Sequence, residues 1–373
     1  MGRVTQRAAA VAGCAVVVLL SAGAASAGPV SAVRSAGLSR WTSGRVAGHL
    51  VAGDPGCFRV AASVKVGTAP EAAAADPKAD LIYVANIGGT ANGFRGTVSV
   101  ISGRTSRVIG TIRVGHGADG VAVNSVTDRI YVTNDYDGTV SVISGRTRRV
   151  VATVRVGVNP QDAAVNATAG AAYVTNFVNG TVSVIRGRRD RVTSTIGLGG
   201  GPDAIAVNPS TGLLYVADNS GNDDRVAVID PRAGSVIASI PLPGEPGGIA
   251  VDRRTNRIYE TSPLGTSVWV ISGQSDSVVA TVGVGPAPVA AAVIPKTGTV
   301  FVASAGPVSV SDARGTVSVI SARTGTVTST IRVGRAPASV AANWKTGRAY
   351  VVNSASGTVL QSGTVSVLAP CRT

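Results

Sequence analysis

The residues of this chain that could do chemistry are few and weakly grouped. Its 373 residues include three cysteines and two histidines. The run Gly115-His116-Gly117-Ala118-Asp119-Gly120 matches the dinucleotide-binding pattern GxGxxG, but that pattern needs a following helix, and Val121-Ala122-Val123 is typical of a strand. A Ser-His-Asp triad would have to use His49 or His116. With no CxxCH sequence for haem, we assign no catalytic residue and no cofactor.

One acidic segment resembles part of a calcium loop. The run Asp218-Asn219-Ser220-Gly221-Asn222-Asp223-Asp224 places side-chain oxygens at alternate positions. It lacks the glycine at the sixth position and the distal glutamate of such a loop. We interpret it as the polar tip of a hairpin and assign no metal ligand.

The composition favours strands and turns over long helices. The chain is 45% hydrophobic and contains 47 glycines and 18 prolines. The apolar share excludes wholesale disorder, and the many glycines and prolines interrupt helices. The net charge of +14 predicts attraction to polyanions and says nothing of the fold.

The N-terminus is typical of an export signal. A basic start precedes an unbroken run of small and apolar residues at 8–20, which leads to Ala25-Ser26-Ala27. This order predicts a signal peptide at 1–27, although Cys14 leaves a lipoprotein as the weaker alternative. Residues 28–56 show no periodicity and are interpreted as a flexible leader. No later run is long enough to span a bilayer, so we expect a soluble protein outside the cytoplasm.

One short motif recurs seven times through the rest of the chain. Its clearest copy is Ile130-Tyr131-Val132-Thr133-Asn134. The copies lie about 45 residues apart, which is the length of a propeller blade. The aromatic residues of the seven copies are Tyr83, Tyr131, Tyr173, Tyr215, Tyr259, Phe301 and Tyr350.

Each copy belongs to a unit of four short apolar runs. In the second unit these runs are 120–124, 129–134, 139–144 and 149–156, and turn-forming residues separate them. The pattern predicts a four-stranded antiparallel sheet in every unit. A single sheet cannot cover both of its faces, so neighbouring sheets must stack. We expect an all-β, seven-bladed β-propeller over residues 57–373, with an open β-solenoid as the alternative.

These motifs resemble the YVTN-repeat family of seven-bladed β-propellers. The resemblance covers about residues 58–370 and includes the run Gly-Thr-Val-Ser-Val-Ile at 138–143 and 180–185. It implies an exported or surface-layer type of protein and a scaffold without a fixed activity. Two copies depart from the motif, because Glu260-Thr261 stands in place of Val-Thr and Phe301 in place of Tyr.

The two ends of the repeat region predict how the ring closes. The last unit lacks its fourth strand, and residues 58–67 match the fourth strand of the first unit. We therefore expect the N-terminal strand to complete the last blade beside Val365–Leu368, which would cover an exposed sheet edge. In this alignment Cys57 and Cys371 fall on adjacent positions of one turn. A disulfide between them is predicted, and two separate thiols are the alternative.

Acidic and aromatic residues are expected at one mouth of the ring. The residue after each inter-blade loop carries an acid or amide in blades 1 to 4 and is small or apolar in blades 5 to 7. In order, these residues are Glu71, Asp119, Gln161, Asp203, Gly247, Val289 and Ala338. Asp162, His116, Phe94, Tyr136 and Phe177 are expected nearby. Carboxylates beside aromatic rings suit a sugar or a small cation, although acids that only tie down their own loops are the alternative.

The opposite face is expected to be strongly basic. Most of the 34 lysines and arginines fall on its turns, whereas most of the 20 acids fall on the mouth side. The densest group is Arg104, Arg107, Arg146, Arg148, Arg149, Arg188, Arg189 and Arg191. Such a face suits an anionic envelope polymer, lipid headgroups or nucleic acid. An ordinary solvated surface is the alternative.

The functional expectation is an exported, non-catalytic binding or scaffold protein. Its partner would be a polyanion, or another protein, held on the basic face. One alternative is a lactonase-like or lyase-like propeller enzyme that uses Glu71, Asp119 and His116 at the mouth. The other is a self-associating cell-surface protein. The oligomeric state stays open.

Overall fold

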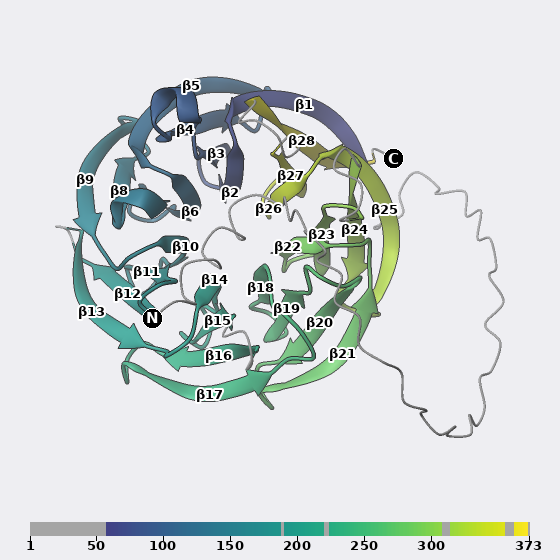
Figure 1. The fold of residues 1–373 in the computed structure, drawn as a ribbon. Helices are drawn as coiled ribbons and strands as arrows, with labels where there is room; N and C mark the ends of the chain where they lie inside the picture. The colour runs from purple at the N-terminus through teal and green to yellow at the C-terminus, as the bar shows by residue number, and fades with distance from the viewer. Residues whose placement is uncertain (1–56, 188–189, 220–223, 308–313, 355–361, 372–373) are drawn as a thin grey trace, which may run out of the picture.

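The computed structural model describes residues 57–187, 190–219, 224–307, 314–354 and 362–371. In these residues the strands form seven four-stranded antiparallel sheets arranged in a ring (Figure 1), which confirms the all-β, seven-bladed propeller. The predicted signal peptide at 1–27, the leader at 28–56 and the candidates Arg188 and Arg189 lie outside the described residues. Within the described part, no helix has the length and apolar character needed to cross a membrane.

Each blade runs from an inner strand at the centre of the ring to an outer strand at its rim (Figure 1). Blades 1 to 4 contain β2 (Pro70–Asp76), β3 (Leu81–Asn86), β4 (Arg95–Ser102), β5 (Arg107–His116); β6 (Ala118–Asn124), β7 (Arg129–Asn134), β8 (Thr139–Ser144), β9 (Arg149–Arg155); β10 (Pro160–Asn166), β11 (Ala171–Asn176), β12 (Thr181–Arg186), β13 (Arg191–Gly197); β14 (Pro202–Val207), β15 (Leu214–Asp218), β16 (Arg225–Asp230) and β17 (Ser235–Pro241).

The remaining three blades complete the ring, and the described residues also include two short 3-10 helices. Blades 5 to 7 contain β18 (Ile249–Asp252), β19 (Arg257–Thr261), β20 (Ser267–Ser272), β21 (Ser277–Gly283); β22 (Pro288–Ile294), β23 (Thr299–Ser304), β24 (Arg314–Ser321), β25 (Thr326–Arg335); β26 (Pro337–Asn343), β27 (Arg348–Asn353), β28 (Ser362–Pro370) and β1 (Phe58–Thr68). The 3-10 helices are η1 (Thr90–Asn92) and η2 (Asp135–Asp137), which lie in the second-to-third turns of blades 1 and 2.

The core lies between blades rather than inside any one of them. The second and third strands are buried along most of their length, and the outer strands alternate between exposed and covered residues. One apolar cluster joins Tyr83 of blade 1 to Val132 of blade 2. The aromatic residue of each motif therefore packs on the next blade, where burying its ring stabilises the stack.

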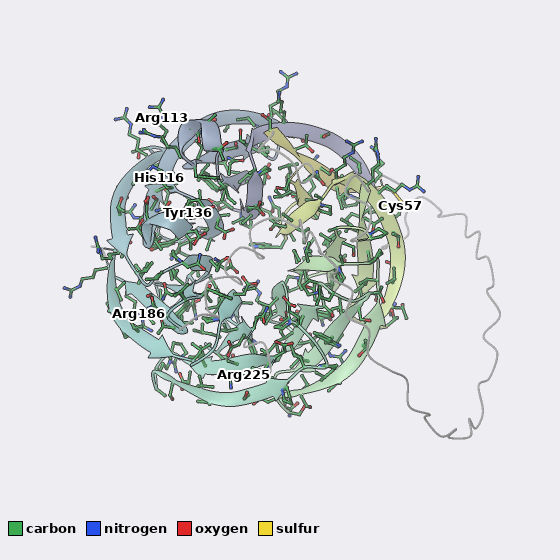
Figure 2. All side chains as sticks on the ribbon, in the orientation of Figure 1. Cys57, Arg113, His116, Tyr136, Arg186 and Arg225 are labelled. Carbon is green, nitrogen blue, oxygen red and sulfur yellow. A yellow bond between two sulfur atoms is a disulfide. The ribbon has the colours of Figure 1, made fainter. Side chains whose placement is uncertain are left out.

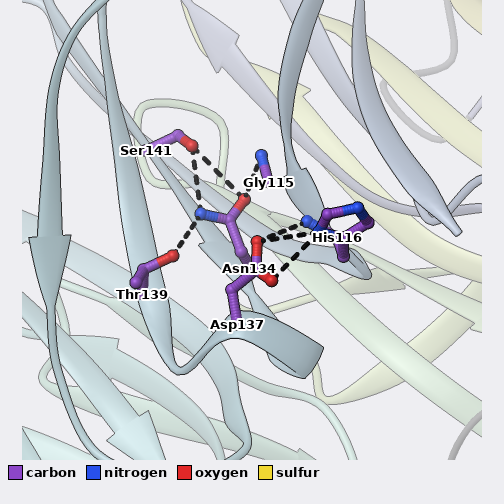
Figure 3. A network of polar contacts seen from close by, with 6 residues as sticks. All are labelled: Gly115, His116, Asn134, Asp137, Thr139 and Ser141. Carbon is purple, nitrogen blue, oxygen red and sulfur yellow. Dashed lines mark hydrogen bonds and ion pairs between the residues drawn. The ribbon is translucent and has the colours of Figure 1, made fainter.

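The Asn, Thr and Ser of the repeated motif form a polar network between blades. In blade 2, Asn134 Nδ2 donates to Thr139 Oγ1 at 2.9 Å and to Ser141 Oγ at 3.0 Å (Figure 3). The Gly115 amide of blade 1 donates to Asn134 Oδ1 at 3.0 Å. In blade 2 the motif asparagine is thus explained by structure, because both its donor and its acceptor find partners within the scaffold.

The two ends of the described chain meet in blade 7. Strand β1 pairs antiparallel with β28, with Val60 opposite Leu368 and Val64 opposite Val365. The predicted disulfide is confirmed: Cys57 and Cys371 are bonded, with their Cα atoms 5.5 Å apart. Residues separated by 314 positions are thereby linked covalently where the ring closes.

Candidate functional site

The loops between blades and the turns from second to third strands share one face of the ring, named here the mouth face. Strands alternate in direction within each blade, so these two kinds of connection must lie on the same side. A direct contact shows it, since the Asp135 amide of a second-to-third turn donates to the Gly117 carbonyl of an inter-blade loop at 2.8 Å.

Five carboxyl groups, named here the carboxyl arc, belong to five successive blades of this face. Four stand near the start of inner strands, and the inner strands of successive blades contact one another around the centre of the ring. The fifth comes from strand β19 of blade 5. The members are Glu71, Asp119, Asp162, Asp203 and Glu260.

The arc carboxyls lie in surroundings that oppose their ionisation. Burial raises the pKa of Glu71 and of Asp203 to about 7 and that of Asp162 to about 6. Burial also raises the pKa of Asp119 well above its usual range, and the charges of neighbouring acids add to this effect. In decreasing order, these neighbours are Glu71, Asp135, Asp203 and Asp162. Because like charges act on one another here, the acids of blades 1 to 4 share one electrostatic site.

Two of the four carboxyls that come from inner strands are fixed by hydrogen bonds. Asp162 accepts the amides of Ala163 at 2.7 Å and of Ile205 at 3.1 Å, so it joins strand β10 to strand β14. Glu71 accepts the Ser354 hydroxyl at 3.3 Å. Asp162 therefore fits the alternative interpretation, in which an acid of the mouth only holds the protein backbone in place.

The carboxyl groups of Asp119 and Asp203, in contrast, are not fixed by hydrogen bonds within the described part of the chain. Neither side-chain carboxyl forms a hydrogen bond or ion pair with a described residue, and both retain some accessible surface. The polar contact at Asp203 is to its backbone, where the carbonyl accepts the Thr175 hydroxyl at 2.7 Å. These two carboxyls are thus available to a ligand.

Sequence reasoning did not place Glu260 in the site. Its Oε1 accepts the Gly247 amide at 2.9 Å, and Gly247 is the residue of blade 5 that corresponds to Asp203 of blade 4. Glu260 thereby supplies from the second strand the carboxyl that blades 1 to 4 supply from the first. The sequence did contain a signal for this role, because Glu260 is a charged residue at the position where the motif has valine.

Two of the three predicted aromatic residues come together beside the arc. The rings of Phe94 and Tyr136 meet edge to face with centroids 5.3 Å apart. Burial and the charges of Asp135, Asp119 and Glu71 raise the pKa of Tyr136, whose side chain is nevertheless half exposed. Tyr136 therefore presents an accessible ring on which the charges of the first two arc carboxyls act.

The other predicted mouth residues do not join this group. The ring of Phe177 lies against Gly201 in the next inter-blade loop. His116 Nδ1 lies 3.0 Å from Asp137 Oδ1, and the His116 amide donates to Asp137 Oδ2 at 2.7 Å (Figure 3). Gln161 contributes its backbone, since its carbonyl accepts the Thr133 hydroxyl at 2.9 Å.

The basic candidates lie in turns and strand ends away from the mouth. Six of them are in the described part of the chain, and all six side chains are exposed and form no ion pair with a described residue. Arg148 has a structural contact as well, because its Nη1 donates to the Ile109 carbonyl of blade 1 at 3.3 Å. The six are Arg104, Arg107, Arg146, Arg148, Arg149 and Arg191.

The arc should make the protein more stable in mild acid. Because the folded pKa values of Glu71 and Asp203, about 7, exceed the ordinary 4.5 and 3.8, the folded chain binds more protons than the unfolded chain between these values. This contribution to stability is complete below about pH 4 and is lost as pH rises through 7. We therefore expect Asp203→Asn to raise the free energy of unfolding by about 2 kcal/mol at pH 8 and by little at pH 4.

Thermal unfolding at pH 4 and pH 8 tests this expectation. Asp230→Asn, which removes an acid from the opposite face, serves as the control and should leave the pH dependence unchanged. Equal pH dependence in the wild-type protein and Asp203→Asn would contradict the argument.

Comparisons with known proteins show the fold and no family. No family model matches the chain, and no curated protein is similar to it in sequence. Among solved structures, the chain is similar to one described as Kuenenia stuttgartiensis Hydrazine Synthase, with a TM-score of 0.67 and 17% identity. The match covers 85% of this chain and 99% of the other. At this identity the likeness supports the β-propeller fold alone.

Proposed function

We propose that this chain is an exported, non-catalytic propeller of the YVTN-repeat type that binds an anionic cell-envelope polymer on its basic face. The basic face is the side opposite the mouth, formed by the first-to-second and third-to-fourth turns. Export accords with the start of the sequence and with the Cys57–Cys371 disulfide, because such bonds persist in oxidising compartments.

The observation that supports this proposal is a set of exposed arginines without acidic partners. A partly buried arginine is treated differently: Arg225 is paired with the buried Asp218 at 2.8 Å. The six described basic candidates are instead exposed and without an acidic partner among the described residues, although Arg148 also donates to the Ile109 carbonyl. Unpaired guanidinium groups on adjacent turns can contact the phosphate or carboxylate groups of a polymer.

The chemistry of that face favours a flexible polymer over stacked bases. Binding through backbone phosphates releases counterions and needs no aromatic residues. Recognition of single-stranded nucleic acid would add aromatic platforms between the arginines, and Trp344 of blade 7 is the one exposed aromatic residue among the described turns of the basic face. We therefore place an envelope polymer before nucleic acid.

Replacing Arg104, Arg146 and Arg149 with serine should weaken binding to soluble polyphosphate at least tenfold at low salt, because three phosphate contacts are lost. The dependence of affinity on salt should also become shallower. Arg148 is left intact because of its contact with Ile109. Binding can be measured by fluorescence anisotropy across a salt series, with single-stranded DNA of equal charge for comparison.

A matched control removes the same charge elsewhere. Arg113, Arg155 and Arg332 are exposed on the mouth-side halves of outer strands, and Arg113 projects from the rim (Figure 2). Their replacement with serine should reduce affinity less than the first triple variant. Equal losses would show a non-specific effect of net charge, and undiminished binding in the first variant would refute the proposal.

A further inference from the structure

We propose that the carboxyl arc, together with the aromatic pair of Phe94 and Tyr136, binds a linear aliphatic polyamine at the mouth face. The inference is independent of the polyanion partner, since it concerns the opposite side of the ring.

The arc carries acidic groups that the described protein does not balance. The Asp119 and Asp203 carboxyls have no described hydrogen-bond partner, although each lies among other acids. The corresponding residues of blades 6 and 7, Val289 and Ala338, bring no charge. A polycation is the kind of ligand that would neutralise several of these carboxyls together.

Glu260 gives a second and independent indication. Its side chain has no exposed surface, and its Oε2 has no hydrogen-bond partner among the described atoms. Its Oε1 is held by the Gly247 amide, and the charge of Asp203 acts on it. Ile258, on the same side of β19 as Glu260, packs with Tyr215 of blade 4, so Glu260 lies on the side of its strand that faces the blade 4 end of the arc. A buried polar oxygen without a partner is costly, so Oε2 indicates a missing donor there.

The spacing of the acids favours an extended ligand over a compact ion. The arc members belong to five different blades, and within the described residues no three acidic, histidine or cysteine side chains are grouped to hold a metal ion. A polyamine carries ammonium groups along a flexible chain, so each can reach a different carboxyl. Its methylene groups and nearest ammonium can contact the accessible ring of Tyr136.

Binding should be coupled to proton release. The groups that face the site are the five arc members, Asp135 of η2, Glu245, which accepts the Asn219 amide, and Tyr136. Among the basic groups of the mouth face, Arg225 is held by Asp218, and His116 is held by Asp137. With the pKa values of Glu71 and Asp203 near 7, ammonium groups replace protons as pH rises through 7.

Calorimetric titration of the mature protein with spermidine tests the proposal. At pH 8 and low salt we expect saturable binding that weakens at least tenfold at pH 5.5, with protons released in proportion at pH 7. Putrescine, which has two ammonium groups, should bind more weakly than spermidine. Ammonium and magnesium ions should bind more weakly still.

Two variants locate the site. Asp119→Asn with Asp203→Asn should weaken spermidine binding at least tenfold at pH 8, and Tyr136→Ala should weaken it about threefold, whereas Tyr136→Phe keeps the ring and the affinity. The control, Asp230→Asn with Asp276→Asn, removes two acids from the basic face and should bind normally. Because Tyr136 is half exposed, its variants remain informative if the double Asn variant does not fold.

Three results would overturn the inference: no spermidine binding at pH 8, equal binding by the Asp119/Asp203 variant, or magnesium binding as tight as spermidine binding. The triple arginine variant of the basic face should keep its spermidine affinity. A failure of the polyphosphate experiment alone would therefore count against the proposed function and leave the polyamine inference standing.

Discussion

Replacing Cys57 and Cys371 with serine should lower the free energy of unfolding by about 5 kcal/mol. The disulfide joins residues 314 positions apart, and a cross-link across so long a segment greatly reduces the entropy of the unfolded chain. Without it, β1 is held in the ring by its pairing with β28 of blade 7 and by packing on blade 6, where the ring centroids of Phe58 and Phe301 are 4.9 Å apart.

The loss should appear first at the seam of the ring. Denaturant titration of the oxidised protein and the double serine variant gives the change in free energy, and hydrogen exchange should be fastest in β1 and β28 of the variant. Reductant should destabilise the wild-type protein and leave the double variant unchanged, which serves as the control. Equal unfolding midpoints for the two proteins would show that strand pairing alone closes the ring.

Much of the fold could be predicted because its determinants are local and repeated. The predicted strands 129–134 and 139–144 of blade 2 coincide with β7 and β8. Their alternating Val, Ile, Thr and Tyr encode a strand within a few residues, and the repetition fixes how many sheets must stack. The disulfide was predictable for the same reason, since aligning the repeats places both cysteines in one turn.

The candidate site was less predictable because it depends on contacts between blades. The sequence indicated Asp119 and Asp203 as mouth residues, yet it could not show that their carboxyls lack partners whereas that of Asp162 has two. Glu260 joins the arc from the second strand of its blade, whereas the other members come from first strands. The repeat alone does not show that side chains from these two strands meet. His116 was grouped with the arc by proximity in the chain, but its partner is Asp137.

Blade 4 contains another contact between blades that the sequence did not predict, and this one belongs to the scaffold. Asp218 stands where blades 2 and 3 have Asn, Arg225 replaces the Thr and Ala227 replaces the Ser of the polar network. The segment resembled a calcium loop in sequence, and its residues 220–223 lie outside the described part. In the structure, Arg225 Nη2 lies 2.8 Å from Asp218 Oδ2 and also donates to the Leu198 carbonyl of blade 3 at 3.1 Å. An ion pair thus does in blade 4 what an amide and two hydroxyls do in its neighbours.

Arg225→Ala should therefore destabilise the protein by about 3–5 kcal/mol, because it leaves the carboxylate of Asp218 fully buried without its cation. The matched control is Arg232→Ala in an exposed turn of the same blade, which should cost less than about 0.5 kcal/mol. Denaturant titration measures both. A loss no larger for Arg225→Ala than for the control would contradict the assigned role of the ion pair.

A compensating variant separates the buried charge from mere loss of side-chain contacts. Asp218→Asn, Arg225→Thr and Ala227→Ser together recreate the residues of blade 2, where Asn134 donates to Thr139 and Ser141. With no charge left to bury, we expect this triple variant to recover most of the stability that Arg225→Ala loses. If it stays as unstable as the single variant, the packing of the arginine itself, including its bond to Leu198, holds blade 4 against blade 3.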